Sequence, residues 1–373
     1  MKNNRTFLEK LLDGAEVEWK PLSKIVTTIT APVKLKREMY CSTGSTPIID
    51  QGEKFIAGYT DENFETIPSN EYIIFGDHSE HIKYINFSFI QGADGLKILK
   101  PKKDNAKYIY YAFQNFYVKE LNYKRHWSSA KETLIPIPPP TVQTEIVKIL
   151  DALTALTSEL TSELTSELIL RRKQYEYYRE KLLSEEELEK VGFEWKPLGE
   201  VTNIKTGQAV SKYSISQNPG IYPVINSGRE PLGFINEWNT ENDPIGITTR
   251  GAGVGSITWQ EGKYFRGNLN YSVTVKSDYK LNIRFLYHIL LHFQKEIHNL
   301  CSFTGIPALN ASELKKLEIS IPAIEEQQRI VLILDKFEAL TNSITEGLPL
   351  AIEQSQKRYE YYRELLLNFP GRE

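Results

Sequence analysis

The segment LTSELTSELTSEL, Leu156 to Leu168, repeats the tetrapeptide Thr-Ser-Glu-Leu three times. It lies in a run of about 40 residues without glycine or proline, and apolar residues upstream of it recur at helical spacing: Ile146, Ile149, Leu150 and Leu153. At about 1.5 Å per residue, such a helix is roughly 60 Å long, and leucines four residues apart form a stripe that drifts about 40° per repeat. We therefore predict a coiled-coil-like rod in which the leucine stripe packs against a second helix.

A second copy of this helix ends the chain. IPPPTVQTEIVKILDALTALT from Ile137 corresponds to IPAIEEQQRIVLILDKFEALT from Ile321, and YEYYRE at Tyr175 recurs at Tyr359 with the same separation. The two segments therefore have equal length. Only the second contains EGLP, Glu346–Pro349, which we expect to kink or break it.

The segments between the helices, about residues 13–137 and 190–321, are also distant copies. EWKPL occurs at Glu18 and at Glu194, and PIIDQG at Pro47 corresponds to PVINSG at Pro223. Both segments are rich in glycine, proline, asparagine and β-branched residues, which predicts short strands with tight turns. Each also contains one amphipathic helix, predicted over 108–116 and 283–293.

The order is thus globule, long helix, globule, long helix. The start LEKLLDGAEVEWKPL resembles the junction REKLLSEEELEKVGFEWKPL at Arg179, as if a cyclic repeat were cut once. We predict an α+β protein with pseudo-two-fold symmetry, in which two long antiparallel helices separate two globules as in a dumbbell. Its expected domains are residues 1–140, 141–185, 186–322 and 323–373.

Charge and composition restrict the function classes. The chain has a formal net charge of -3, but residues 151–190 carry 6 basic against 10 acidic side chains and residues 323–373 carry 6 against 9. The globules are therefore mildly basic, and overall acidity does not exclude DNA. Cys41 and Cys301 are too far apart for a disulfide scaffold, so we expect two reduced, buried thiols. No apolar run is long enough to span a membrane, which favours a cytoplasmic protein.

Motifs for catalysis are absent from the sequence. RGAGVGS at Arg250 lacks the spacing of a dinucleotide loop, and NPG at Asn218 is not the Asn-Pro-Pro-aromatic run of adenine methyltransferases. His78 and His81 have no obvious third metal ligand. Asp13 with Glu18-x-Lys20 faintly resembles a nuclease motif, but the second copy lacks the aspartate, so Trp-Lys-Pro is better explained as a buried anchor of each globule. We expect no catalytic residue and no metal.

The chain resembles the specificity subunits of type I restriction–modification systems, in particular the type IC subclass with tetrapeptide repeats. The resemblance rests on the start LLDGAEVEWKPL, the repeat segment, the restart EWKPL, EEQQRIVLILDKFEALTNSITEGLP and YEYYRELLL. YPVINSGREPLGFI and GDH at Gly76 are similar, more loosely, to the recognition domains of that family.

This resemblance implies a subunit without a catalytic site, in which each globule reads one half of a bipartite, gapped DNA site. It also implies helices that set the gap and dock two methyltransferase subunits, which use S-adenosylmethionine. Two motor–nuclease subunits that use ATP and Mg²⁺ can join them. We therefore expect no cofactor in this chain itself.

The repeat then acts as a ruler. One TSEL unit adds about 6 Å and about 40° to a helix, whereas one base pair rises about 3.4 Å and turns about 35°. The rotation that one repeat adds to the helix matches the turn of one base pair, whereas the length that it adds is nearer the rise of two. Because a recognition domain must meet its groove face-on, we predict one base pair per repeat.

Candidate contacts follow from the need for cations at phosphates and for donors and acceptors at base edges. For DNA they are Lys34, Lys36, Arg37, Lys54, Lys83, Arg125, His126, Lys205, Ser211, Lys212, Arg229, Arg250, Lys263 and Arg266. Arg125-His126-Trp127 and Arg250 are favoured because they lie among glycine or aromatic residues in expected loops. For partner subunits the candidates are Leu160, Leu164, Tyr175, Tyr178, Tyr359 and Tyr362. Solvated charge explains any one cation equally well, and the tyrosines can instead join the two helices.

Two other functions remain open at this stage: a two-headed adaptor that binds protein, and a self-contained DNA-modifying enzyme. The missing cofactor and methyltransferase motifs count against the enzyme. An adjacent adenine methyltransferase gene would favour the specificity subunit over the adaptor.

Overall fold

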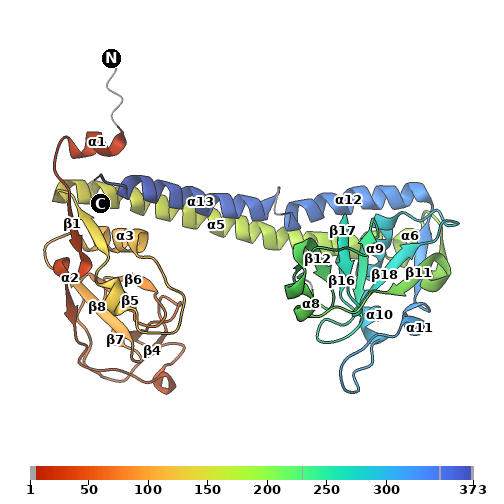
Figure 1. The fold of residues 1–373 in the computed structure, drawn as a ribbon, viewed down its shortest axis with the longest axis horizontal. Helices are drawn as coiled ribbons and strands as arrows, with labels where there is room; N and C mark the ends of the chain where they lie inside the picture. Colours follow the sequence, from red (N-terminus) through yellow and green to blue (C-terminus); the bar gives the residue numbers. More distant parts are fainter. Residues whose placement is uncertain (1–5, 229, 344–345, 371–373) are drawn as a thin grey trace, which may run out of the picture. The chain divides into compact units, whose positions relative to one another are not determined.

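The computed structural model describes residues 6–228, 230–343 and 346–370. They form two compact units, the first within Met1–Glu163 and Ile352–Glu373, the second within Leu164–Ala351. Both units mix helices with sheets, and the long helix α5 (Pro140–Leu182) contributes its first part to the first unit and its last part to the second (Figure 1). The α+β class predicted from the sequence is therefore confirmed.

The first unit contains a four-stranded antiparallel sheet, a three-stranded sheet and a two-stranded ribbon. The four-stranded sheet has the order β2 (Val26–Ile29), β8 (Leu96–Pro101), β5 (Tyr72–Gly76), β6 (Ile82–Ile85). The three-stranded sheet is β4 (Gly58–Thr60), β3 (Thr46–Ile49), β7 (Ile90–Gln91), and the ribbon pairs β1 (Glu18–Pro21) with β9 (Leu134–Ile137). The helices of this unit, besides the long ones, are α1 (Phe7–Leu12), α2 (Leu22–Ile25), η1 (Arg37–Met39), α3 (Ala106–Phe116) and α4 (Trp127–Ala130).

The second unit repeats this plan. Its first sheet has the order β11 (Thr202–Thr206), β18 (Asn270–Val275), β15 (Ile245–Thr248), β16 (Ile257–Trp259). Its second sheet has the order β13 (Phe234–Ile235), β12 (Pro219–Ile225), β17 (Lys263–Arg266), β14 (Thr240–Glu241). The ribbon pairs β10 (Phe193–Pro197) with β19 (Glu318–Pro322). Its helices are α6 (Glu185–Glu189), α7 (Leu198–Val201), α8 (Lys212–Gln217), α9 (Ile283–His292), α10 (Gln294–Asn299), α11 (Ala311–Leu314) and α12 (Ile324–Asn342).

The two copies of EWKPL form the ribbons and the turns that follow them. Glu18 pairs with Ile137 and Glu194 with Ile321, so each globule begins and ends on one ribbon beside the long helices. We expected Trp-Lys-Pro to be the buried anchor of each globule, but the fully buried residues are the leucines that open the next helix, Leu22 and Leu198. Trp19 is half-buried against the core, and Trp195 is 42% exposed.

A short helix fixes each globule to the long helix beside it. In the first unit, Lys107 and Tyr111 of α3 both bond to Asp151 of α5, at 2.7 Å each. In the second, Arg284 and His288 of α9 bond to Asp335 of α12, at 2.7 and 2.8 Å. The two aspartates come from the repeated Ile-Leu-Asp, so the same sequence element makes the same attachment with different partners.

The long helices run antiparallel within each unit. In the first, Ile146 and Leu150 of α5 share a core with Leu367 of α13 (Leu348–Leu367), while Thr154 bonds to Tyr359 at 3.2 Å. In the second, the ring of Tyr178 stacks on that of Phe337 in α12 at 5.4 Å. The predicted break in the second helix is confirmed, because α12 ends at Asn342 and α13 begins at Leu348.

The repeat leucines do not all pack as expected. Leu156 and Leu160 are 63% and 42% exposed, whereas Leu164 and Leu168 are half-buried. A stripe that drifts about 40° per repeat turns progressively toward a packed face, which accounts for the change along the helix. The prediction of a packed leucine stripe is therefore wrong for its first two members.

The first and the last of the described segments, around Leu8–Trp19 and Leu366–Pro370, lie together in the first unit. The Trp19 indole N–H donates to the Pro370 carbonyl oxygen at 3.1 Å, and Leu8 and Phe369 belong to the same core. This contact completes the cyclic order that the sequence indicated. Cys301 is buried as expected, but Cys41 is exposed. Within the described residues, no helix combines the length and the apolar character that a membrane span requires.

Candidate nucleic-acid interface

Five of the candidate cations of the first unit lie at its surface: Lys34, Lys36, Arg37, Lys54 and Arg125. The ammonium of Lys34 is 2.9 Å from Asp94. The hydrogen bond from Lys34 and the charges of Lys34 and Arg125 lower the pKa of Asp94. The structure therefore brings two of the predicted cations around one exposed carboxylate, although they lie far apart in the sequence.

In the second unit the exposed candidates are Lys205, Ser211, Lys212, Arg250 and Lys263. Ser211 caps α8, because its hydroxyl accepts from the Ser214 amide at 3.1 Å. The ammonium of Lys263 lies 4.5 Å from the centre of the Trp238 ring. Lys205 borders a polar pocket that Gln208 and Asn239 also line.

Three candidates are buried, so the expectation that they face DNA is corrected. Lys83 is 6% exposed, and its ammonium donates to the Asp50 carbonyl oxygen at 2.9 Å and to that of Lys54 at 2.6 Å. His126 is fully buried and donates to the Asn122 carbonyl oxygen at 2.8 Å. Buried side chains held in this way do not reach a base or a phosphate at the surface.

Arg266 is the third, at 3% exposure. Its guanidinium donates to the carbonyl oxygens of Ile245 and Tyr271, at 3.0 Å each, and to that of Asp243 at 2.6 Å. It therefore joins β17 to the neighbouring four-stranded sheet, a role that its position in a strand could not reveal. Arg229, the remaining candidate, lies outside the described residues.

The pocket beside Lys205 contains an amide pair that the sequence did not single out. Asn239 Nδ2 donates to Gln208 Oε1 at 3.3 Å and to the Arg266 carbonyl oxygen at 3.0 Å. These bonds use both N–H groups of Asn239, so Gln208, which is exposed, is the amide that can match the donor and acceptor of adenine in the major groove. Gln208 and Asn239 are recognised as a pair only in the folded structure, because 31 positions separate them in the sequence.

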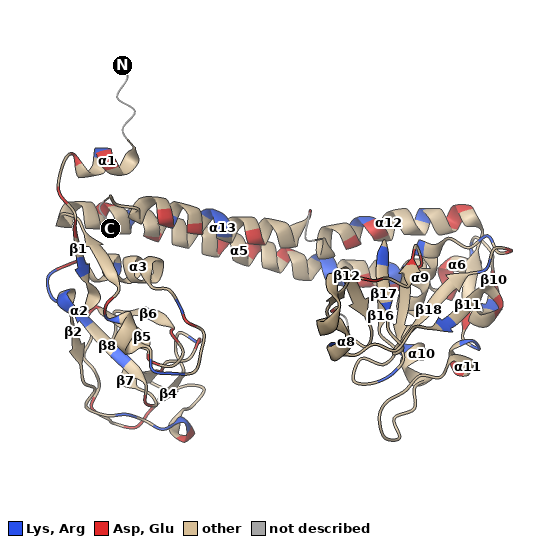
Figure 2. Cartoon of the chain, in the orientation of Figure 1, with Lys and Arg blue, Asp and Glu red and all other residues tan. Residues whose placement is uncertain are grey.

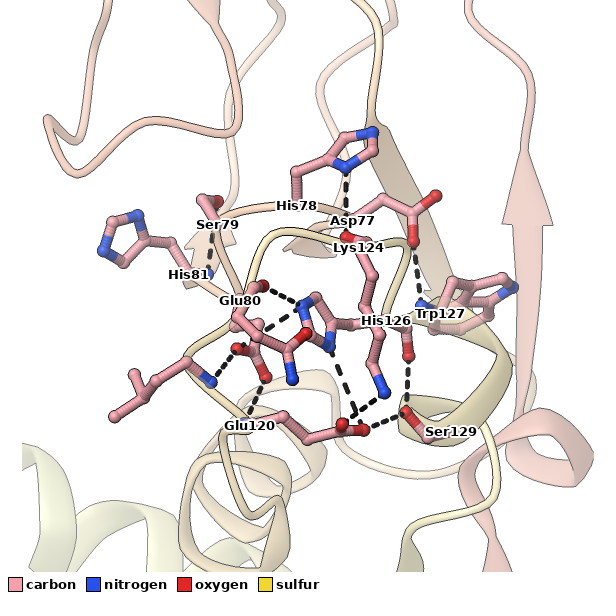
Figure 3. Close-up of polar contacts among 12 residues, drawn as sticks. Asp77, His78, Ser79, Glu80, His81, Glu120, Lys124, His126, Trp127 and Ser129 are labelled. Atoms are coloured by element: carbon pink, nitrogen blue, oxygen red, sulfur yellow. Dashed lines mark hydrogen bonds and ion pairs between the residues drawn. The ribbon is translucent and has the colours of Figure 1, made fainter.

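The turn between β5 and β6 holds the loop that contains Arg125 (Figure 3). Glu80, 2% exposed, accepts from the Tyr117 hydroxyl at 2.6 Å and from the amides of Glu120 and Leu121 at 2.9 Å each. Burial raises the pKa of Glu80, but these hydrogen bonds and His126 outweigh it, so its pKa lies below the ordinary value. His78 adds a bond to the Lys124 carbonyl oxygen at 3.0 Å.

The tyrosines proposed as partner contacts divide into inward and outward sets. Tyr175 is 8% exposed and bonds to His288, Tyr178 stacks on Phe337, and Tyr359 bonds to Thr154. These three join elements within their units, so Tyr175 in particular is corrected as a docking residue. Tyr362 is 41% exposed and Leu164 half-buried. The most exposed tyrosines of the two motifs, Tyr177 and Tyr361, were not among the predicted residues.

One group of possible metal ligands occurs among the described residues. The side chains of His288, Asp335 and Glu338 offer atoms within 4.8 Å of one another. Arg284 donates to both carboxylates, at 2.7 and 2.9 Å. The guanidinium of Arg284 therefore supplies the positive charge that balances these two carboxylates, in the place where a metal ion would otherwise do so. Acidic side chains also recur along α5, α12 and α13 (Figure 2).

Comparisons with known proteins agree with this arrangement. The family model of the type I restriction modification DNA specificity domain matches residues 16–169 and again 190–354. A putative type I restriction enzyme specificity subunit of Haemophilus influenzae is 41% identical, with 99% of this chain and 100% of the relative covered. The EcoR124I/EcoR124II specificity subunit of Escherichia coli is 37% identical, with 98% and 97% covered.

Solved structures agree in fold. The S subunit from M. genitalium superposes with a TM-score of 0.54 at 19% identity, covering 96% of this chain and 98% of that one. A chain from a structural study of complex assembly in the type I R-M system gives 0.57 at 17% identity, with 96% and 99% covered. With two copies of the family domain and full-length relatives, the chain belongs to the DNA specificity subunits of type I restriction–modification enzymes.

Proposed function

We propose that each unit reads one half of a bipartite, gapped DNA site and that the long helices set the gap. The observation that carries this proposal is the duplication of one plan within one chain, with a matching four-stranded sheet, a matching ribbon and an attachment to a long helix at the same aspartate of the repeat. Two related units on one chain suit two half-sites at a fixed spacing.

We further propose that the chain binds two methyltransferase subunits, one at each copy of YEYYRE. Tyr177 and Tyr361 hold matched positions in these motifs and are 59% and 61% exposed. Each meets the next tyrosine edge-on, with ring centres 5.4 Å apart. Two copies of one partner need two equal surfaces, and exposed tyrosines are frequent anchors of protein interfaces.

Methyl transfer would then take place in the partners, which supply S-adenosylmethionine, while motor–nuclease subunits with ATP and Mg²⁺ would cut unmodified DNA. In this scheme the specificity chain contributes recognition and spacing and performs no chemistry. Its tetrapeptide repeats support an assignment to the type IC subclass.

The test is to co-express the chain with its neighbouring methyltransferase in a methylation-free host and to map methylated adenines across the genome. We expect a single motif of two short half-sites around a fixed gap. If the complex assembles but no such motif is methylated, the proposal fails and a protein-binding adaptor becomes the better explanation.

A further inference from the structure

Each unit carries one loop that is mounted on the same part of the fold and ends in exposed apolar side chains. We call residues 117–126 the first finger and residues 302–308 the second finger. The first leads from the end of α3 to α4, and the second leads from α10 to α11. The short helices α4 and α11 correspond, because Ala130 and Leu314 hold matched, fully buried positions before the return strands β9 and β19.

The mount of both fingers is the turn between the third and fourth strands of the four-stranded sheet. In the first unit this turn follows β5, and its Glu80 and His78 hold the finger by the bonds described above. In the second unit the turn follows β15. Its Gly251 amide donates to the Pro307 carbonyl oxygen at 3.0 Å, and its Thr249 carbonyl accepts from the Leu309 amide at 2.8 Å.

Both fingers are ordered at the base by the chain itself. Ser302 and Ala308 exchange two main-chain hydrogen bonds, of 2.8 and 3.0 Å, which close the second finger. In the first finger, the ring of Tyr123 stacks on that of His78, with ring centres 5.3 Å apart. Such loops are pre-organised, so less conformational entropy is lost when they bind.

The tips expose large apolar side chains, although one ring in each finger touches a histidine of its own unit: Tyr123 touches His78 and Phe303 touches His298. Leu121 and Tyr123 are 85% and 90% exposed in the first finger, and Phe303 and Ile306 are 54% and 63% exposed in the second. The second finger has no charged residue (Figure 2). The first has three basic residues, Lys119, Lys124 and Arg125, against the single acid Glu120.

The fingers differ between the two units, whereas the YEYYRE motifs are identical, and this difference favours DNA over a protein partner as the ligand of the fingers. Two copies of one protein partner require the same residues twice, as in YEYYRE. The fingers share a mount but differ in length and in every tip residue. Different tips on equal mounts are what two different DNA half-sites require, and the low acidity of both tips is compatible with a polyanion.

We propose that the two fingers enter the DNA grooves, one in each half-site, and that their apolar tips contact base edges. This inference rests on the proposed function and names the residues that perform the reading. Apolar side chains distinguish bases through the thymine methyl group in the major groove, or by entering between base steps from the minor groove. The exposed cations nearby, Arg125 and Arg250, would then hold the adjoining phosphates.

The first experiment compares two double variants, Leu121→Ala/Tyr123→Ala and Phe303→Ala/Ile306→Ala, each in complex with the methyltransferase. Two readouts are used: a map of methylated adenines, and competition for binding by DNA duplexes altered at single base pairs. Each variant should lose roughly 10-fold in discrimination at one base pair or more of one half-site, while the other half-site and the gap stay unchanged. Phe7→Ala and Val191→Ala, exposed apolar positions outside the fingers, serve as controls that keep the full motif.

The inference is overturned if the finger variants keep the whole motif, or if they weaken binding to all duplexes equally, which would indicate backbone contacts alone. A wild-type complex that methylates no bipartite motif would instead overturn the proposed function, and this inference with it.

A second measurement does not depend on activity. Tyr123→Cys and Phe303→Cys are made in a Cys41→Ser background, because Cys41 is exposed. Each is mixed with duplexes that carry a thiol-tethered base in one half-site or the other. We expect a disulfide to one half-site from residue 123 and to the opposite half-site from residue 303. Equal cross-linking to both halves, or to neither, contradicts the assignment.

Discussion

Gln143 and Gln327 make the same hydrogen bonds in the two units. Each accepts through its side-chain oxygen from the amide of the asparagine that caps the neighbouring helix, Asn105 at 2.9 Å and Asn282 at 2.8 Å. Each also donates to the carbonyl oxygen of a proline five residues earlier, at 3.0 and 2.9 Å. Both side chains are 1% exposed, so one glutamine in each unit connects the return strand, the recognition globule and the long helix.

Gln327→Ala should therefore destabilise the second unit. It leaves the partly buried amide of Asn282 and the buried carbonyl of Pro322 without these bonds, a loss of about 1–3 kcal/mol. Thermal unfolding and hydrogen exchange at the Asn282 amide measure it. The neighbouring Gln328→Ala is the matched control, since Gln328 is exposed. Equal unfolding of the two variants would show that the bond network does not stabilise the unit.

The attachment of α9 to α12 should weaken in acid. Burial raises the pKa of Asp335, but the hydrogen bonds from His288 and Arg284 outweigh it and lower that pKa. Asp335 therefore stabilises the second unit fully above its unfolded pKa of about 4, and this contribution is lost as the pH falls through the lower folded value. We expect Asp335→Asn to reduce stability at neutral pH and to flatten its acid dependence, measured by denaturant unfolding from pH 7 to 3. The exposed Glu325→Gln should leave that curve unchanged.

Gly347 ends the break between α12 and α13 with a φ of 88°, and an added Cβ would lie 2.7 Å from the carbonyl oxygens of Ala339 and Leu340. Gly192 has a φ of 80° but open space around it. Gly192→Ala should cost only the left-handed backbone conformation, about 1–2 kcal/mol. Gly347→Ala should cost clearly more, because the clash adds to it. Similar melting temperatures for the two variants would contradict this account.

Deletion of one repeat, Thr161–Leu164, should shorten the gap of the methylated motif by one base pair while both half-sites stay the same. The deletion removes about 40° of helical rotation, close to the turn of one base pair. Replacing the same four residues with alanines keeps the helix length and should keep the gap. An unchanged gap after the deletion would exclude the repeat as a ruler.

Tyr177→Ala and Tyr361→Ala should each weaken the binding of one methyltransferase subunit without affecting folding, because both side chains are mostly exposed. Analytical ultracentrifugation should show one bound partner for each single variant and none for the double variant. Tyr178→Ala should differ, since it removes the stacking on Phe337 and lowers the melting temperature. Full assembly of the double variant would exclude these tyrosines as the docking points.

The periodic parts of the sequence predicted their own structure. The repeats that begin at Ile137 and Ile321 start in the return strands and continue as α5 in the first copy and as α12 and α13 in the second. EGLP interrupts the second copy, because helical spacing and proline or glycine act over a few residues. The predicted amphipathic helices are α3 and α9, within two residues of the expected ends. The duplication also indicated a cyclic order of the segments, and the bond from Trp19 to Pro370 agrees with it.

Charged residues in the globules were less predictable. Arg266 and Arg250 were both candidates for DNA contact, yet Arg266 is buried among carbonyl oxygens and Arg250 is exposed. His126 was favoured for its aromatic neighbours, and it is instead part of the loop anchor at Glu80. The fingers were missed because exposed apolar residues in a loop have no periodic signal.

By itself the sequence determined the duplication, the long helices with their break, and the family, since each depends on residue order and on local backbone preferences. Only the tertiary structure decided which cations are free and which loops project. A side chain becomes buried or exposed through contacts with strands far away in the chain, such as those between Arg266 and the carbonyl oxygens of Asp243 and Ile245. For charged side chains outside the periodic helices, burial is decided by the packed fold, and no local pattern of residues encodes it.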